Sequence, residues 1–454
     1  MLILLTLVAP PALEAQRLPA CDANVKCPAT MICTGQRCLS VDQLYGARFD
    51  VLHHTISIAV IPVRALDDRP ETRRAAKTLG QVLEHDFGSA PEYRLIPTSR
   101  FPFGWREDST HPATFPKERW RLTEALGAIG GSVRSLAQGR IEVHLYLVPI
   151  GLMTVKRAPA IKVFVSSRPR TVRGLAHLFA NEVTGAFTGR RGAFGTRIAF
   201  SRQVRMGVKE IFVTEYLSKR TEQITHDDSL ALLPSWSRDG RLAFTSYRRG
   251  NPDLYLDSRT LSARARLNIG ASFAPDGRRL ALSLSKDGNA ELYLLDARNG
   301  AILRRLTHRR SVDISPSFSP DGRYLAFVSD RSGTPQVYAM DLRLPDRPAR
   351  VSKSGSYNTS PNWSSDGSMI VYCGQTAGAT RFDLFVYHVR SGHTRRITFS
   401  GKNERPWFSP DSRWIVFARK SKTSQRLYLI RPDGSGLREL PVGLGIDTMP
   451  AWSF

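Results

Sequence analysis

Short alternating runs of apolar residues recur along the second half of the chain after turns of the Asp-Gly type, with Ser412 in place of the glycine in the fifth copy. Residues 316–322 (Pro-Ser-Phe-Ser-Pro-Asp-Gly) are the clearest copy. One aromatic residue marks each repeat, at intervals of 37 to 45 residues: Trp236, Phe273, Phe318, Trp363, Phe408 and Trp452. A period of this length built from short strands is typical of a β-propeller with one blade per repeat. We therefore predict an all-β six-bladed propeller over residues 191–454.

Each repeat has the same internal order. An apolar run such as residues 325–327 follows Asp-Gly, and a second run such as residues 336–338 ends in an aromatic residue. Glycine accepts positive φ in the turn, and the aspartate hydrogen-bonds the backbone of its own turn. The last repeat reaches Trp452 without an Asp-Gly turn after it, whereas residues 197–201 form a strand with no marker before it. We therefore expect the ring to close between residues 198 and 452.

Residues 43–190 have a different pattern, which predicts a separate α/β domain. Alternating or continuous apolar runs predict strands at 56–63, 93–96, 141–148 and 160–165. Apolar residues with helical spacing predict helices at 71–87, 120–126 and 172–187. A glycine-rich linker at 189–195 leads into the propeller.

The N-terminus carries signals of export. Residues 1–15 form an apolar stretch that ends in small residues, so we interpret residues 1–20 as a signal peptide. Four cysteines follow within residues 21–42, at Cys21, Cys27, Cys33 and Cys38. An even, dense group in an exported chain predicts a short disulfide-rich module with two bonds. Their pairing, and whether Cys21 is lipidated, stay open. Cys373 follows a strand run and is predicted to be a buried free thiol.

The formal net charge is +25, from 65 Lys and Arg against 40 Asp and Glu. Such an excess fits an anionic partner, including peripheral contact with an anionic envelope surface. It also fits a composition in which arginine occupies every solvated surface, and both interpretations stay open. No RNA-binding motif or aromatic platform accompanies the basic residues, so no nucleic acid partner is expected.

The sequence lacks the motifs of the main enzyme classes. There is no Gly-x-Ser-x-Gly, no His-Glu-x-x-His, no P-loop and no dinucleotide fingerprint. The ligand-like groups His53-His54 and His226-Asp227-Asp228 are better explained as ordinary polar residues near strands and loops. We therefore expect no catalytic, metal or cofactor site.

The order of the parts resembles a known family. An α/β domain, the junction Gly-Ala-Phe-Gly-Thr-Arg-Ile-Ala-Phe at 192–200, the repeats and a final Pro-Ala-Trp-Ser at 450–453 resemble the TolB family of the Tol-Pal envelope system, whose repeats are of the PD40/WD40-like type. The resemblance covers roughly residues 50–454. It implies a non-enzymatic periplasmic scaffold that binds the peptidoglycan-associated lipoprotein Pal through the propeller and TolA through its N-terminal region. It also implies a role in outer-membrane integrity and envelope constriction during cell division. The alternative is an envelope propeller that binds another protein or an anionic ligand.

A ring of equivalent positions is the candidate partner face. Five residues before the markers stand Ala231, Asn268, Asp313, Asn358, Asn403 and Asp447, and their neighbours are Ile269, Ile314, Thr359, Glu404 and Thr448. Equivalent positions fall on one ring at a propeller mouth, and the resemblance implies that Pal-contacting loops lie at this kind of position. The alternative is that Asn and Asp only shape a turn before each strand. Leu267 stands where the family often has histidine.

Residues 43–55 are the candidate N-terminal partner segment, with Tyr45, Phe49, Val51 and Leu52 as apolar anchors. The resemblance implies a mobile strand that docks on the body in one state and is released to meet TolA in another. The alternative is an ordinary first strand of the α/β sheet.

Overall fold

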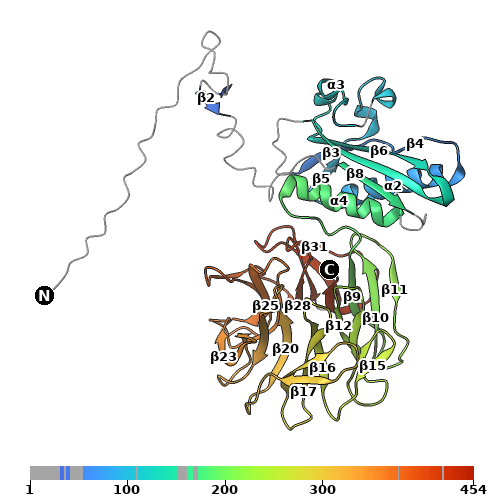
Figure 1. Ribbon diagram of the computed structural model, residues 1–454. Helices are drawn as coiled ribbons and strands as arrows, with labels where there is room; N and C mark the ends of the chain where they lie inside the picture. The colour runs from blue at the N-terminus through green and yellow to red at the C-terminus, as the bar shows by residue number, and fades with distance from the viewer. Residues whose placement is uncertain are drawn as a thin grey trace.

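The computed structural model describes residues 31–34, 37–40, 55–108, 111–150, 161–166, 172–376, 378–421 and 424–454. Within them an α/β part packs on a β-propeller (Figure 1). The predicted signal peptide, Cys21, Cys27 and the four anchors of the segment 43–55 lie outside the described residues. None of the described helices is long and apolar enough to cross a membrane.

The cysteine-rich stretch requires a correction. Its described part is a hairpin of β1 (Met31–Thr34) and β2 (Arg37–Ser40), in which Cys33 and Cys38 are direct register partners. No disulfide is found among the described residues, so the predicted disulfide-rich module is not supported. The backbone ladder of the hairpin holds the two strands together there. Cys373 is a buried free cysteine, as predicted.

The α/β part is built on one mixed sheet with the order β5-β3-β6-β7-β8, and β4 pairs with β6. β3 runs parallel to β5 and β6, whereas β7 pairs antiparallel with β6 and β8. The strands are β3 (Ile56–Val60), β4 (Arg64–Ala65), β5 (Tyr93–Leu95), β6 (Gly127–Ser135), β7 (Ile141–Pro149) and β8 (Ile161–Ser166).

Two long helices, α2 (Pro70–Ser89) and α4 (Val172–Thr188), lie on the side of this sheet that faces the propeller (Figure 1). Their buried faces, with Leu79, Phe87 and Phe179, have the helical spacing predicted from the sequence. The predicted helix at 120–126 is wrong: α3 covers Lys117–Arg121, and Glu124 has a positive φ of 62°. The chain then enters β6, a strand that the pattern did not predict. Three short 3₁₀ turns, at Thr98–Arg100, Trp105–Glu107 and Ala137–Gly139, complete this part.

The prediction of a propeller with six separate blades is wrong. Among the described residues of the propeller, the hydrogen bonding defines four separate four-stranded sheets and one eight-stranded sheet. The cause is β32, which pairs with β9 on one side and, through Ile446 opposite Gln425, with β30 on the other. The two repeats at the ends of the ring are thereby joined into one sheet.

The four separate sheets follow the chain in order. They are β12 (Ala231–Trp236), β13 (Leu242–Ser246), β14 (Asp253–Leu256) and β15 (Arg259–Ser262); β16 (Asn268–Phe273), β17 (Arg279–Leu284), β18 (Glu291–Asp296) and β19 (Ile302–Arg305); β20 (Asp313–Phe318), β21 (Tyr324–Ser329), β22 (Gln336–Asp341) and β23 (Leu344–Arg350); and β24 (Tyr357–Trp363), β25 (Met369–Gln375), β26 (Asp383–His388) and β27 (Thr394–Arg396).

The eight-stranded sheet contains both ends of the propeller. Its strands are β9 (Arg197–Arg205), β10 (Val208–Glu215), β11 (Thr221–Gln223), β28 (Lys402–Phe408), β29 (Ile415–Lys420), β30 (Gln425–Ile430), β31 (Arg438–Glu439) and β32 (Ile446–Trp452). Ile198 lies opposite Trp452, which confirms the predicted closure between residues 198 and 452.

The junction between the two parts contains a buried cluster of titratable groups. His177 of α4 lies with Nδ1 2.7 Å from the Asp86 carboxylate of α2 and with Nε2 3.2 Å from Glu215 of β10. Burial lowers the pKa of His177, but the two carboxylates outweigh it and raise that pKa to about 9. His177 and Arg173 lower the pKa of Glu215 to about 2, whereas burial raises the pKa of Asp86. A second buried ion pair joins Glu92 to Arg413 at 3.1 Å.

Candidate functional site

Every innermost strand of the propeller bends at the same place. The register against the next strand shifts there, and one residue adopts a left-handed conformation, with φ between 53° and 70°. These residues are Leu233, Gly270, Ser315, Ser360, Arg405 and Met449. Five of them precede a proline, which has no N–H to donate to the ladder and is therefore tolerated at a bulge. The repeated bulge is part of the architecture of the channel.

The bulged residues line the central channel. A cavity of about 70 Å³ lies at the level of the bulges and is lined mainly by prolines and small residues such as Pro316 and Ala271. A second cavity of about 70 Å³ lies at the end of the channel where the Asp-Gly turns stand. Each has room for a few water molecules, far below the volume of a typical small-molecule site. The channel itself therefore does not suit an organic substrate.

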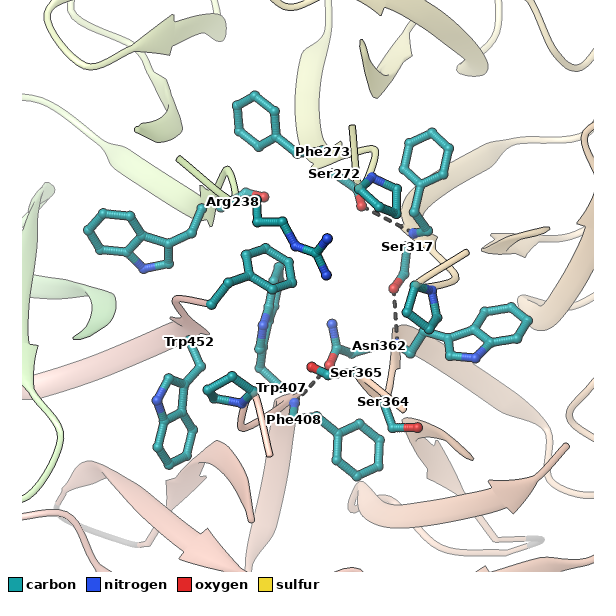
Figure 2. A pocket seen from close by; sticks show the side chains of 18 of the residues that line it. Arg238, Ser272, Phe273, Ser317, Asn362, Ser364, Ser365, Trp407, Phe408 and Trp452 are labelled. Carbon is teal, nitrogen blue, oxygen red and sulfur yellow. Dashed lines mark hydrogen bonds between the residues drawn. The ribbon is translucent and has the colours of Figure 1, made fainter. Parts of the chain in front are cut away.

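Hydrogen bonds between repeats border the second cavity. Ser272 accepts a bond from the backbone N–H of Phe318 at 3.2 Å, and Ser317 accepts one from Trp363 at 3.0 Å. Asn362 accepts the equivalent bond from Phe408 at 2.7 Å. Figure 2 shows these bonds as dashed lines around the opening, with Arg238 and Trp407 beside it. These polar side chains thus join neighbouring repeats.

The five predicted Asn and Asp residues stand at the other end of the channel, each at or near the start of an inner strand. All five side chains are buried: Asn268, Asp313, Asn358, Asn403 and Asp447. Asn268 accepts a bond from Ser262 at 2.6 Å and donates one to the carbonyl of Arg264 at 2.6 Å. These contacts tie the loop before β16 to the strand, and Asn358 and Asn403 donate equivalent bonds to the carbonyls of Ser354 and Ser400.

Two of these five side chains, those of Asp313 and Asp447, are carboxylates, and each accepts hydrogen bonds from an arginine. Asp447 accepts a two-pronged contact from Arg202, at 2.7 and 3.0 Å, across the closing pair of strands. Asp313 accepts two bonds from Arg331, each of 3.2 Å, and one from the Ser311 hydroxyl at 3.4 Å. A buried carboxylate needs such a partner to offset its desolvation.

Their neighbours form the accessible ring. Ile269, Ile314, Thr359 and Glu404 are partly exposed, whereas Thr448 is buried and contacts Lys209 at 3.4 Å. We call the four partly exposed residues the mouth ring. It combines two apolar residues with a hydroxyl and a carboxylate, a composition that suits contact with a protein surface.

The remaining polar candidates have structural partners. Asp227 accepts bonds from Ser246 at 2.5 Å and Arg248 at 3.2 Å, and Asp228 pairs with Arg205. Asp321 accepts a bond from its turn backbone at Arg323, as predicted for the Asp-Gly turns. Across the described residues no group of three or more His, Cys, Asp or Glu side chains is arranged to hold a metal ion, and His53 and His54 lie outside them.

Sequence reasoning did not find two features of the structure. One is the junction cluster around His177, whose members come from α2, α4 and β10. The other is a set of exposed apolar residues on loops of the eight-stranded sheet, including Met206, Phe399 and Leu444. Neither has a sequence signal, because both depend on which loops and helices the fold brings together.

Comparisons with known families and with curated relatives all point to the same family. Residues 185–454 match the family described as the TolB beta propeller domain, PD40. A Tol-Pal system protein TolB from Desulfosudis oleivorans is 35% identical over 262 residues, which cover 56% of this chain and 58% of the relative. A Tol-Pal system protein TolB from Anaeromyxobacter dehalogenans strain 2CP-1 is 31% identical over 54% of this chain and 56% of its own length. The matches thus span just over half of these relatives.

The crystal structure of TolB from Acinetobacter baumannii resembles the whole architecture. It covers 88% of this chain and 97% of its own, with a TM-score of 0.71 and 22% sequence identity. At this identity the match indicates a shared fold, and it includes the α/β part that precedes the propeller.

Proposed function

The chain belongs to the TolB beta propeller domain family, and from this we propose that it is a non-enzymatic periplasmic scaffold of a Tol-Pal type system. The observation that carries the proposal is the family match over residues 185–454, which contain the mouth ring. Curated relatives are named as Tol-Pal system proteins. The channel cavities are too small for an organic ligand, so we place the binding of partners at the surface of the molecule.

The proposed partner of the mouth ring is a Pal-like peptidoglycan-associated lipoprotein. The buried Asn and Asp residues hold the loops, and in four repeats the mouth ring supplies a partly exposed side chain that a partner can touch. We propose TolA-like binding for the N-terminal segment 43–55, on the basis of the family resemblance. Together these contacts would support outer-membrane integrity and envelope constriction during division.

The test is a binding measurement with the full chain and a purified soluble domain of a Pal-like lipoprotein. Changing Ile269→Ser and Ile314→Ser together should weaken binding by about tenfold or more, because apolar contacts at the centre of an interface carry much of its affinity. The matched control is Leu303→Ser on β19, an exposed apolar residue on the outer strand of the sheet that contains Ile269.

Binding that survives the double change, or that the control weakens equally, contradicts the mouth ring as the contact. If the parent chain does not bind the Pal-like domain at all, the Pal proposal fails. Recovery of other envelope components on the immobilised chain would then favour the alternative, an envelope propeller for another protein or an anionic ligand.

A further inference from the structure

One end of the eight-stranded sheet carries three of the most exposed apolar side chains on the propeller. Met206 is 91% exposed, Leu444 is 87% exposed and Phe399 is 67% exposed. Each stands on a loop between strands: Met206 between β9 and β10, Leu444 between β31 and β32, and Phe399 between β27 and β28. Single exposed apolar residues need no explanation, but three at loop tips of one sheet do.

The strand register places these three loops at the same end. Across the sheet, Lys402 lies opposite Lys420, and Lys420 lies opposite Gln425. Gln425 in turn faces Ile446, and Ile446 faces Gln203. This row crosses five neighbouring strands. Each of the three apolar residues lies two or three positions along the chain from a member of the row. All three therefore lie beyond the same ends of the strands, and we call this side of the sheet the edge.

Cations accompany the apolar tips. Lys402 and Lys420 are exposed and directly opposite each other, an arrangement that is unfavourable for like charges. In the described part of the chain, neither lysine forms an ion pair with an acidic side chain. Arg419 and Arg426 are also register partners on β29 and β30. An external anion would relieve the repulsion within this group.

The neighbouring acidic residues offset only part of this positive charge. Asp228 is engaged with Arg205, and Glu404 lies nearer the channel, in the mouth ring. Lys209 is half-buried on β10; burial and the nearby Lys420 lower its pKa, and Glu404 opposes this shift without cancelling it. The edge thus combines protruding apolar tips with an excess of positive charge, the combination that suits insertion between anionic headgroups.

We propose that this edge, defined by Met206, Phe399, Leu444, Lys402 and Lys420, docks the propeller on an anionic phospholipid surface. The apolar tips enter the boundary between headgroups and acyl chains, and the lysines contact lipid phosphates. A protein interface is less favoured, because its centre is typically depleted of lysine and packed flat, whereas here the apolar residues stand apart on separate loops. The proposal adds a lipid contact to the protein contacts proposed above and does not depend on them.

Co-sedimentation of the full chain with vesicles tests the proposal. We expect binding to vesicles of equal parts phosphatidylglycerol and phosphatidylcholine, weak binding to pure phosphatidylcholine, and weakening with added salt as charges become screened. Changing Met206, Phe399 and Leu444 together to Ser should lower the partition coefficient by about tenfold or more. Lys402→Gln with Lys420→Gln should lower it by about fivefold for each lysine.

Matched controls lie on the α/β part. Phe103 is 99% exposed and Leu122 is 90% exposed, so Phe103→Ser with Leu122→Ser removes similar apolar surface from another site and should leave vesicle binding unchanged. All variants change exposed side chains, and equal thermal unfolding curves would show that each is folded.

Three results would overturn the proposal. The first is that the parent chain does not sediment with phosphatidylglycerol vesicles at low salt. The second is that the Phe103 and Leu122 control loses as much vesicle binding as the triple variant, and the third is that the triple variant keeps full vesicle binding. If vesicles do not bind while the triple variant loses a Pal-like protein, the edge is a protein contact and the lipid proposal is also overturned. If the Ile269 and Ile314 variant keeps vesicle binding, the edge is shown to act separately from the mouth ring.

Discussion

His177 links the two parts of the molecule through charge. Its ring lies between Asp86 of α2 and Glu215 of β10. These carboxylates raise the pKa of His177 to about 9, so the ring stays protonated in the folded protein until the pH approaches that value. In the unfolded chain the ring loses its proton near pH 6.5. The stabilisation from this raised pKa is therefore fully present below about pH 6.5 and is lost as the pH rises through about 9.

A His177→Gln variant should reveal this dependence. We expect the difference in unfolding free energy between parent and variant to be largest near pH 6 and to shrink progressively towards about pH 10. Urea denaturation at a series of pH values measures it, with the exposed His308→Gln as control. A difference that stays constant over this range would show that the charge of His177 has no role.

Individual residues show what the sequence could and could not predict. The positions of Asn268, Asp313 and their equivalents on one ring followed from the repeat period, because a period alone fixes equivalent places in a propeller. Their burial did not follow, because it depends on loops that fold back over them and donate hydrogen bonds. The proposed partner contacts therefore rest on neighbours such as Ile269.

Strand β6 is the element that the pattern did not predict. It contains Gly127, Gly130 and Gly131, which weaken a strand signal, yet it lies at the centre of the α/β sheet. The glycines are needed because of close packing: a Cβ at Gly131 would lie 2.2 Å from the carbonyl oxygen of His144, and one at Gly127 would lie 2.9 Å from the ring of Phe187. Such tertiary constraints override local propensity.

This packing predicts opposite outcomes for two glycine substitutions. Gly131→Ala should destabilise the protein by about 2–3 kcal/mol, because the backbone of β7 would have to move. Gly80→Ala, in α2, has nothing within 4 Å of the new methyl group and should stabilise by about 0.5–1 kcal/mol through helix propensity. Chemical denaturation of both variants gives the comparison. Equal effects would mean that β6 can shift freely away from β7.

At the scale of the whole molecule, the ring depends on its last strand. β32 contributes Ala451 and Trp452 to the core, and Trp452 donates a hydrogen bond to Thr196 at 2.8 Å. Removing residues 446–454 would leave β9 without its inner neighbour and expose its edge.

We expect the truncated chain to lose cooperative unfolding of the propeller and to bind a hydrophobic dye. Calorimetry and dye fluorescence measure this, and Phe454→Ser, which changes a half-exposed residue beyond β32, is the control. A truncated chain with the parent's sharp transition would show that the ring is stable while open.

The closure of the ring could be predicted because this long-range pairing left a trace in the sequence, whereas the prediction of six separate blades was wrong. The final Pro-Ala-Trp-Ser and the unmarked strand at 197–201 complement each other, so the closure could be inferred. The fusion of two repeats into one eight-stranded sheet could not, because it depends on the single pair of Gln425 and Ile446.

The position of β9 determines how the molecule bears mechanical force. The linker from the α/β part enters the propeller at Arg197, whose backbone is bonded to Ser453 through both its N–H and its carbonyl. β9 lies between β10 and β32, so a pull along it from the linker loads the ladders on both sides at once, in shear. Tension applied to the N-terminal part would therefore separate the helices from the propeller, at the contacts of His177 and Arg413, before it peeled the ring apart.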